Sequence, residues 1–170
     1  MSSLAARSAL SHLSPQGAAE LRQPGLVLRE ERALRIAHLF AAEEARPFGV
    51  DAPQEPNRVA TGRAACAWIA PGEWLVIGED LPPGAALDAS DGYAALSLSG
   101  PQARALLSKS VPIDLDPRAF GADACARTLM GAIPIFLMAR GADGFLLLVE
   151  RALAHAAWGW LTDGARALTP

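Results

Sequence analysis

Residues 95–120, ALSLSGPQARALLSKSVPIDLDPRAF, carry strand and helix signals in an order that defines the middle of the fold. Leu96 and Leu98 alternate with serines, which is the period of a half-buried strand. Pro101 suits the first turn of a helix, because the N–H that proline lacks would have no partner there. The stretch therefore predicts a strand, a tight turn, a short helix and a loop.

The helix in this stretch has start and stop signals at both ends. Ser99 and Gln102 have the spacing of a capping box. Arg104 is expected to point outward, and Pro112 forces the preceding residue into an extended conformation that ends the helix. The positions expected to share one apolar stripe are Ala103, Leu106 and Leu107.

Strands and hairpins are expected on both sides of this central unit. Alternating or continuous apolar runs bounded by Gly and Pro are the basis for these assignments. The expected strands cover residues 26–29, 34–39, two arms of a hairpin over 64–78, 126–130, 134–140 and 145–149, with one or two helical turns at 40–45. The pattern predicts an α+β fold, a mostly antiparallel sheet with helices on one side, of ferredoxin-like type.

A C-terminal helix is expected to begin near Arg151. Its expected apolar face contains Leu153, Ala157, Trp160, Leu161 and Leu168, and its polar face Arg151, His155, Thr162 and Arg166. Trp158 lies at the border between these faces. An exposed Trp158 would be a candidate partner contact, whereas a buried one would belong to the core.

The chain is expected to divide into a flexible N-terminal arm, residues 1–24, and a single α+β domain, residues 25–170. The arm is either a disordered tail or a segment that orders on a partner subunit. Arg7 and Leu10 are its candidate partner contacts.

Composition excludes several classes of function. The 170 residues carry a net charge of −3, which argues against nucleic-acid binding, and no apolar run is long enough to span a membrane. No apolar signal segment is evident near the start, so a cytoplasmic location is expected. Cys66 and Cys125 are expected to be buried free thiols, with a disulfide left open.

No clustered reactive groups are evident in the sequence. The histidines, at positions 12, 38 and 155, occur singly, without metal-ligand spacing. Asp114 and Asp116 could form a carboxylate pair, but Asp116 precedes a proline and is expected to stabilise a turn, as is Asp88 before Ser90. We therefore predict no catalytic, cofactor-binding or metal-binding residue.

Several segments together resemble the gamma subunit family of heterotetrameric sarcosine oxidase and, more distantly, the first domain of glycine-cleavage T-protein-type aminomethyltransferases. The matching segments are residues 68–75, 88–90, 98–101, 112–115, 117–120 and 147–151. The resemblance implies a folate-binding aminomethyltransferase-like domain. The aminomethyltransferases carry an acid in the hairpin that corresponds to residues 128–134, and this chain has none there.

The resemblance also implies a function in a multi-subunit flavin amine oxidase that converts sarcosine to glycine. This chain would be a non-catalytic accessory subunit beside alpha, beta and delta subunits. By the same resemblance FAD, FMN, NAD and tetrahydrofolate would bind to those partners. Two alternatives stay open: a stand-alone folate-binding or one-carbon-transfer protein, and a structural scaffold for an unrelated dehydrogenase.

Overall fold

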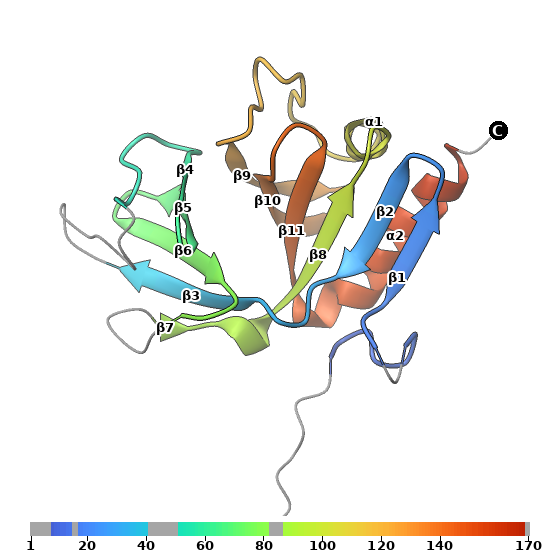
Figure 1. The fold of residues 1–170 in the computed structure, drawn as a ribbon, viewed down its shortest axis with the longest axis horizontal. Helices are drawn as coiled ribbons and strands as arrows, with labels where there is room; N and C mark the ends of the chain where they lie inside the picture. The colour runs from blue at the N-terminus through green and yellow to red at the C-terminus, as the bar shows by residue number, and fades with distance from the viewer. Residues whose placement is uncertain (1–7, 15–16, 41–50, 82–86, 169–170) are drawn as a thin grey trace, which may run out of the picture.

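The computed structural model describes residues 8–14, 17–40, 51–81 and 87–168. In these ranges the chain forms two antiparallel sheets with short helices (Figure 1). Sheet A has the strand order β1-β2-β8-β11-β10-β9, and sheet B has the order β4-β5-β6-β3-β7. The strands of sheet A are β1 (Glu20–Gln23), β2 (Leu26–Glu30), β8 (Tyr93–Ser99), β9 (Cys125–Met130), β10 (Ile133–Ala139) and β11 (Gly144–Glu150). The strands of sheet B are β3 (Arg35–Phe40), β4 (Val59–Thr61), β5 (Ala65–Ala70), β6 (Glu73–Gly78) and β7 (Leu87–Asp88).

Sheet A is the middle of three layers. Helices α1 (Ala103–Ser108) and α2 (Ala154–Arg166) cover one face, and sheet B packs on part of the other. Strand β11 shows this best: Phe145, Leu147 and Val149 join the core on the helix side, and Leu146 and Leu148 join the core against sheet B. A strand that is buried on both faces has no solvent-facing position where a polar residue would be favoured. This explains the continuous apolar sequence of β11.

The fold class expected from the sequence is confirmed: strands are antiparallel and the helices lie on one side of sheet A. The hairpin at 64–78 is confirmed as β5 and β6. The expected strands at 26–29 and 34–39 also exist, but β2 and β3 lie in different sheets. The helical turns expected at 40–45 fall outside the described residues, except for Phe40, which ends β3.

The central unit is confirmed as strand β8, a tight turn and helix α1, but the capping box is wrong. The N-cap of α1 is Gln102, and no side chain caps the helix. Backbone contacts to other turns hold this corner instead, because the Gln102 N–H donates to the carbonyl of Gly25 (3.0 Å) and the Gly100 N–H donates to that of Asp143 (2.9 Å).

The N-terminal residues are packed against sheet A well before the expected boundary at residue 25. Leu10 is completely buried in the core on the helix side, and β1 pairs with β2 through residues 20–23. Glu30, a buried carboxylate, accepts hydrogen bonds from the Ser8 hydroxyl and the Ala19 N–H and forms an ion pair with Arg32. The expectation of a flexible arm up to residue 24 is therefore wrong for these segments.

The apolar face of α2 differs from the expected one. Trp158 and Thr162 are buried, and Trp160 is 48% exposed. The 3-10 helix η3 (Arg151–Leu153) precedes α2. Within α2 the buried positions follow the helical spacing of three and four residues: 154, 157, 158, 161, 162 and 165. In the described part of the chain, no helix combines the length and apolar character that crossing a membrane requires.

Candidate functional site

A cleft of about 370 Å³ lies between the two sheets, at the side where β9 and β10 approach β5 and β6. Sheet A supplies one wall and sheet B the other. The lining residues are His38, Ile69, Leu75, Tyr93, Arg127, Thr128, Leu129, Pro134, Ile135, Phe136, Leu148 and Glu150. Its size is that of a site for a small molecule or for a side chain of a partner.

The cleft is mostly apolar, and five of its lining residues are polar: His38, Tyr93, Arg127, Thr128 and Glu150. Arg127 and Glu150 have no salt bridge to any residue that the structure describes. The His38 Nε2 atom lies 3.5 Å from the Tyr93 hydroxyl, which is long for a hydrogen bond, and their rings are stacked with centroids 6.5 Å apart. These residues could hold an apolar group that carries a charge, but they do not form a close nucleophile and base pair.

Sequence reasoning did not select Tyr93, Arg127 or Glu150. They lie on three strands far apart in the sequence, and strand pairing brings them to one cleft: Tyr93 pairs with Glu150, and Arg127 pairs with Phe136. His38 was expected to be an ordinary surface or hydrogen-bonded residue. No short motif joins these positions, so only the sheet register could have revealed them.

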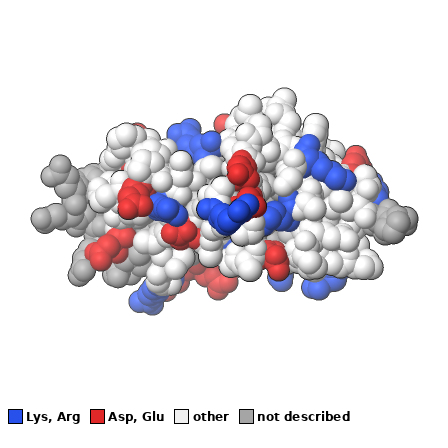
Figure 2. All heavy atoms as spheres, turned by 90° about the horizontal axis from the view of Figure 1, so that it is seen from above, with Lys and Arg blue, Asp and Glu red and all other residues white. Residues whose placement is uncertain are grey.

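The acidic residues near the central helix hold turns, as expected. Asp114 accepts a hydrogen bond from the Asp116 N–H (2.9 Å), and Asp116 accepts from the N–H and the guanidinium of Arg118 (both 2.9 Å). The hydrogen bond from the Arg118 side chain is the main cause that lowers the pKa of Asp116. Acidic and basic side chains also stand side by side on the face seen from above (Figure 2).

Asp88 has the same role at the start of η2 (Ser90–Gly92). It accepts hydrogen bonds from the Ser90 N–H (3.0 Å) and hydroxyl (2.6 Å), and Arg35 forms an ion pair with it. The Ser90 side chain, followed by its backbone N–H and Arg35, lowers the pKa of Asp88 to about 2. Ser90 also accepts from the Ile36 N–H (3.0 Å), so the Asp88–Ser90 pair joins η2 to β3.

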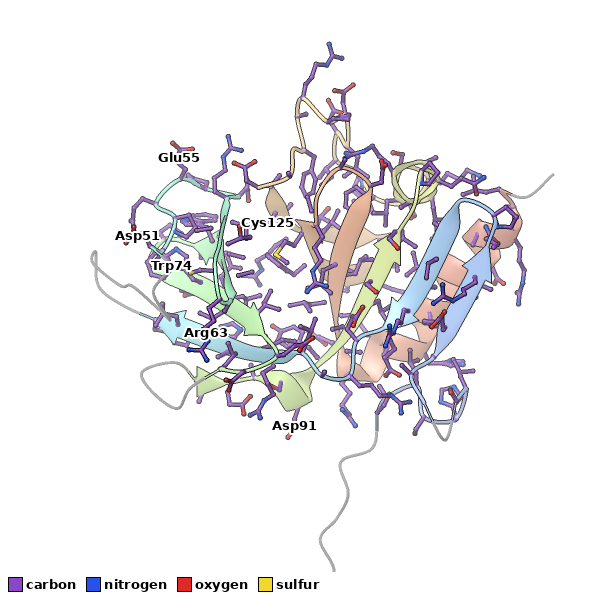
Figure 3. The ribbon with its side chains drawn as sticks, in the orientation of Figure 1. Asp51, Glu55, Arg63, Trp74, Asp91 and Cys125 are labelled. Carbon is purple, nitrogen blue, oxygen red and sulfur yellow. The ribbon has the colours of Figure 1, made fainter. Side chains whose placement is uncertain are left out.

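Cys66 and Cys125 are both free and buried, which settles the open question of a disulfide in this structure. Burial raises the pKa of each thiol to about 12. Cys125 lies where sheet A meets sheet B (Figure 3), with its Sγ atom 3.4 Å from the carbonyl oxygen of Trp68. The two thiols are therefore packing residues and poor nucleophiles at neutral pH.

The candidate partner contacts have little free surface. Leu10 is 0% exposed and Trp158 is 9% exposed, so Trp158 meets the criterion for a core residue. Arg7 lies outside the described residues. The rings of His12 and His155 lie side by side, with centroids 4.8 Å apart. No three potential metal ligands come together in the described ranges.

Comparison with known proteins gives consistent matches. The model of the sarcosine oxidase, gamma subunit family matches residues 76–167. A sarcosine oxidase subunit gamma from Corynebacterium sp. (strain P-1) is 32% identical over 171 residues, covering 91% of this chain and 84% of the relative. A second sarcosine oxidase subunit gamma, from Arthrobacter sp, is 33% identical over 134 residues, covering 70% of this chain and 66% of the relative.

Two solved structures have related folds. A chain of the heterotetrameric sarcosine oxidase from Corynebacterium sp. U-96, in complex with pyrrole 2-carboxylate, superposes with a TM-score of 0.85 at 28% identity, covering 97% of both chains. Aminomethyltransferase T of the Bartonella henselae glycine cleavage system gives a TM-score of 0.59 at 13% identity, covering 89% of this chain and 55% of the enzyme, and shows a shared fold only. The chain therefore belongs to the sarcosine oxidase gamma subunit family.

Proposed function

We propose that this chain is the accessory gamma subunit of a heterotetrameric sarcosine oxidase and supports assembly of the complex that oxidatively demethylates sarcosine to glycine. The observation that carries the proposal is the superposition over 97% of both chains, at a TM-score of 0.85, on a chain of the Corynebacterium sp. U-96 heterotetramer. A shared fold over the whole length is compatible with a shared place in the assembly.

The subunit itself is proposed to be non-catalytic. Its acids at positions 88, 114 and 116 hold turns, and its thiols are buried with a raised pKa. In the cleft, Tyr93 and His38 lie beside Arg127 and Glu150, but they form no close nucleophile and base pair. FAD, FMN, NAD and tetrahydrofolate would then bind to partner alpha, beta and delta subunits, with the whole complex in the cytoplasm.

Co-expression tests this proposal directly. The full chain, carrying an affinity tag, is produced with the other subunits of the same organism, and the purified material is assayed for flavin absorbance and for oxygen uptake with sarcosine. We expect a coloured, active complex, and no turnover by the tagged chain produced alone. A chain that purifies without partners, or that oxidises sarcosine by itself, contradicts the proposal.

Arg7 and Leu10 remain proposed contacts of the N-terminal segment with a partner, as does Trp158. Because Leu10 is part of the core, removing residues 1–16 would also weaken the fold. Removing residues 1–7 alone separates the two effects. We expect weaker assembly with an unchanged melting temperature of the free chain, and equal assembly would exclude a role for Arg7.

A further inference from the structure

Strand β9 is the last strand of sheet A, and half of its backbone groups face away from the sheet. The Ala139 N–H donates to the Ala124 carbonyl (2.9 Å), so residue 124 faces β10, whereas the Cys125 N–H donates to Asn57 outside the sheet (2.9 Å). Successive residues of a strand point their N–H and C=O groups to alternate sides of that strand. Arg127 and Leu129 therefore present their N–H and C=O groups outward.

Another part of the chain already uses the beginning of this edge. Arg58 forms a bridge with Ala124, and the Val59 N–H donates to the carbonyl of Asp123 (2.8 Å). Asn57, with φ of 61°, has a left-handed conformation that turns the chain away from β9. Beyond this turn, no described residue hydrogen-bonds to the outward groups of Arg127 or Leu129.

The side chains of β9 include a single charge, that of the exposed Arg127. Natural edge strands are usually short or carry charges that discourage pairing, and β1 at the opposite edge carries the Glu20–Arg22 ion pair. Near the β9 edge, Leu129 is 45% exposed, and the exposed Trp160 lies against the turn that follows β9. Large exposed apolar residues beside unpaired backbone groups are typical of a surface that another chain covers.

The exposed charge at this edge indicates what the covering segment carries. Arg127 is exposed, lines the cleft and has no salt bridge among the residues that the structure describes. A carboxylate on the covering segment would pair with it, and an apolar side chain would pack against Leu129. A helix could not satisfy the edge, because its backbone groups are bonded within the helix.

We propose that an extended segment of a partner subunit adds to β9 as a further strand, hydrogen-bonded to Arg127 and Leu129, with a carboxylate opposite Arg127 and an apolar side chain on Leu129. This inference rests on the proposed function, which supplies the partner. It adds β9 to the proposed partner contacts at Arg7, Leu10 and Trp158.

Amide hydrogen exchange of the full chain, alone and in the co-purified complex, tests the inference. The Arg127 and Leu129 amides should exchange freely in the free chain and at least about tenfold more slowly in the complex, since strand addition gives them hydrogen bonds. The Thr128 amide, which already faces β10, is the internal control for β9. The outward amides of Glu20 and Arg22 are the control for an edge that stays free.

Each outcome is decisive. Slow exchange of Arg127 and Leu129 in the free chain would mean that the chain itself or a second copy covers β9, and would overturn the inference. Fast exchange in an intact complex would also overturn it while leaving the proposed function standing. If no complex copurifies, the proposed function fails first and the inference falls with it.

Two substitutions test the same edge through binding. Leu129→Pro removes an outward N–H without removing a hydrogen bond to β10, so the chain should fold yet assemble at least about tenfold more weakly. Arg22→Pro, at an outward position of β1, is the matched control. Arg127→Glu changes only an exposed charge, so this variant should fold and should assemble more weakly even if Leu129→Pro fails to fold. Normal assembly of Arg127→Glu would contradict the predicted carboxylate on the partner segment.

Discussion

The carbonyl oxygen of Gly25 lies where a side chain at Gly100 would have to be. A Cβ atom at Gly100 would be 2.4 Å from that oxygen, and Gly100 has φ of +111°. The β1–β2 turn and the turn before α1 therefore pack backbone against backbone. Such an approach requires a residue without a side chain at position 100, and it holds the start of α1 close to the β1–β2 turn.

Gly100→Ala is expected to destabilise the chain by about 3 kcal/mol or more, because both the backbone conformation and the contact with Gly25 are lost. Gly141→Ala is the matched control. Gly141 also has positive φ, +76°, but nothing lies within 4 Å of a Cβ there, so only about 1 kcal/mol is expected. Urea unfolding of the two variants measures the difference. Equal losses would mean that the contact contributes nothing.

The sequence predicted the elements around Gly100 well, because their signals are local. The alternation in β8, the Pro-Gly turn of the β5–β6 hairpin and the apolar run of β11 all report on neighbours in the chain. The division into two sheets could not be predicted, since a period of two shows which residues share a face and not which strands pair. Strand β1 was missed because four residues next to Pro24 give too short a pattern.

The exposed and buried tryptophans of α2 show a second limit of prediction from the sequence. Trp158 and Trp160 are two residues apart, so they point to nearly opposite sides of a helix and only one can be buried. Deciding between them requires knowing which side of α2 packs against sheet A, and Trp158 lies on that side. The cleft residues Tyr93, Arg127 and Glu150 were missed for a related reason, because long-range pairing alone brings them together.

Arg104 was expected to face solvent and instead joins three segments. Its guanidinium donates to the carbonyls of Leu115, Phe120 and Ala142 and lies over the ring of Phe145, 5.0 Å from its centroid. Arg104→Met should cost about 2–3 kcal/mol, since three carbonyls lose a charged donor. Thermal unfolding measures the loss.

Arg118→Met is the control for that measurement. Arg118 is 91% exposed, and among the described residues its ion pair is with Asp116, so its loss should leave the melting temperature nearly unchanged. A similar effect of the two substitutions would mean that Arg104 acts as an ordinary surface charge.

Cys66 and Cys125 are expected to resist modification while the chain is folded. Burial raises the pKa of each thiol to about 12, so almost no thiolate exists at pH 8. An aromatic disulfide reagent should release no chromophore from the folded chain and two equivalents in urea. Rapid reaction of the folded chain would show that the junction of the two sheets opens readily.

Asp88 should titrate well below an ordinary aspartate. Its pKa is lowered from 3.8 to about 2, chiefly by the Ser90 hydroxyl, then by the Ser90 N–H and Arg35. Because the pKa is lower in the folded chain than in the unfolded chain, ionised Asp88 stabilises the fold above about pH 4. This stabilisation is lost as the pH falls from about 4 towards 2. Carboxyl NMR titration measures the midpoint, and Ser90→Ala should raise it, since the strongest donor is removed. An unchanged midpoint in Ser90→Ala would contradict the Ser90 hydroxyl as the main cause and would leave the backbone N–H of residue 90 and Arg35 as the causes.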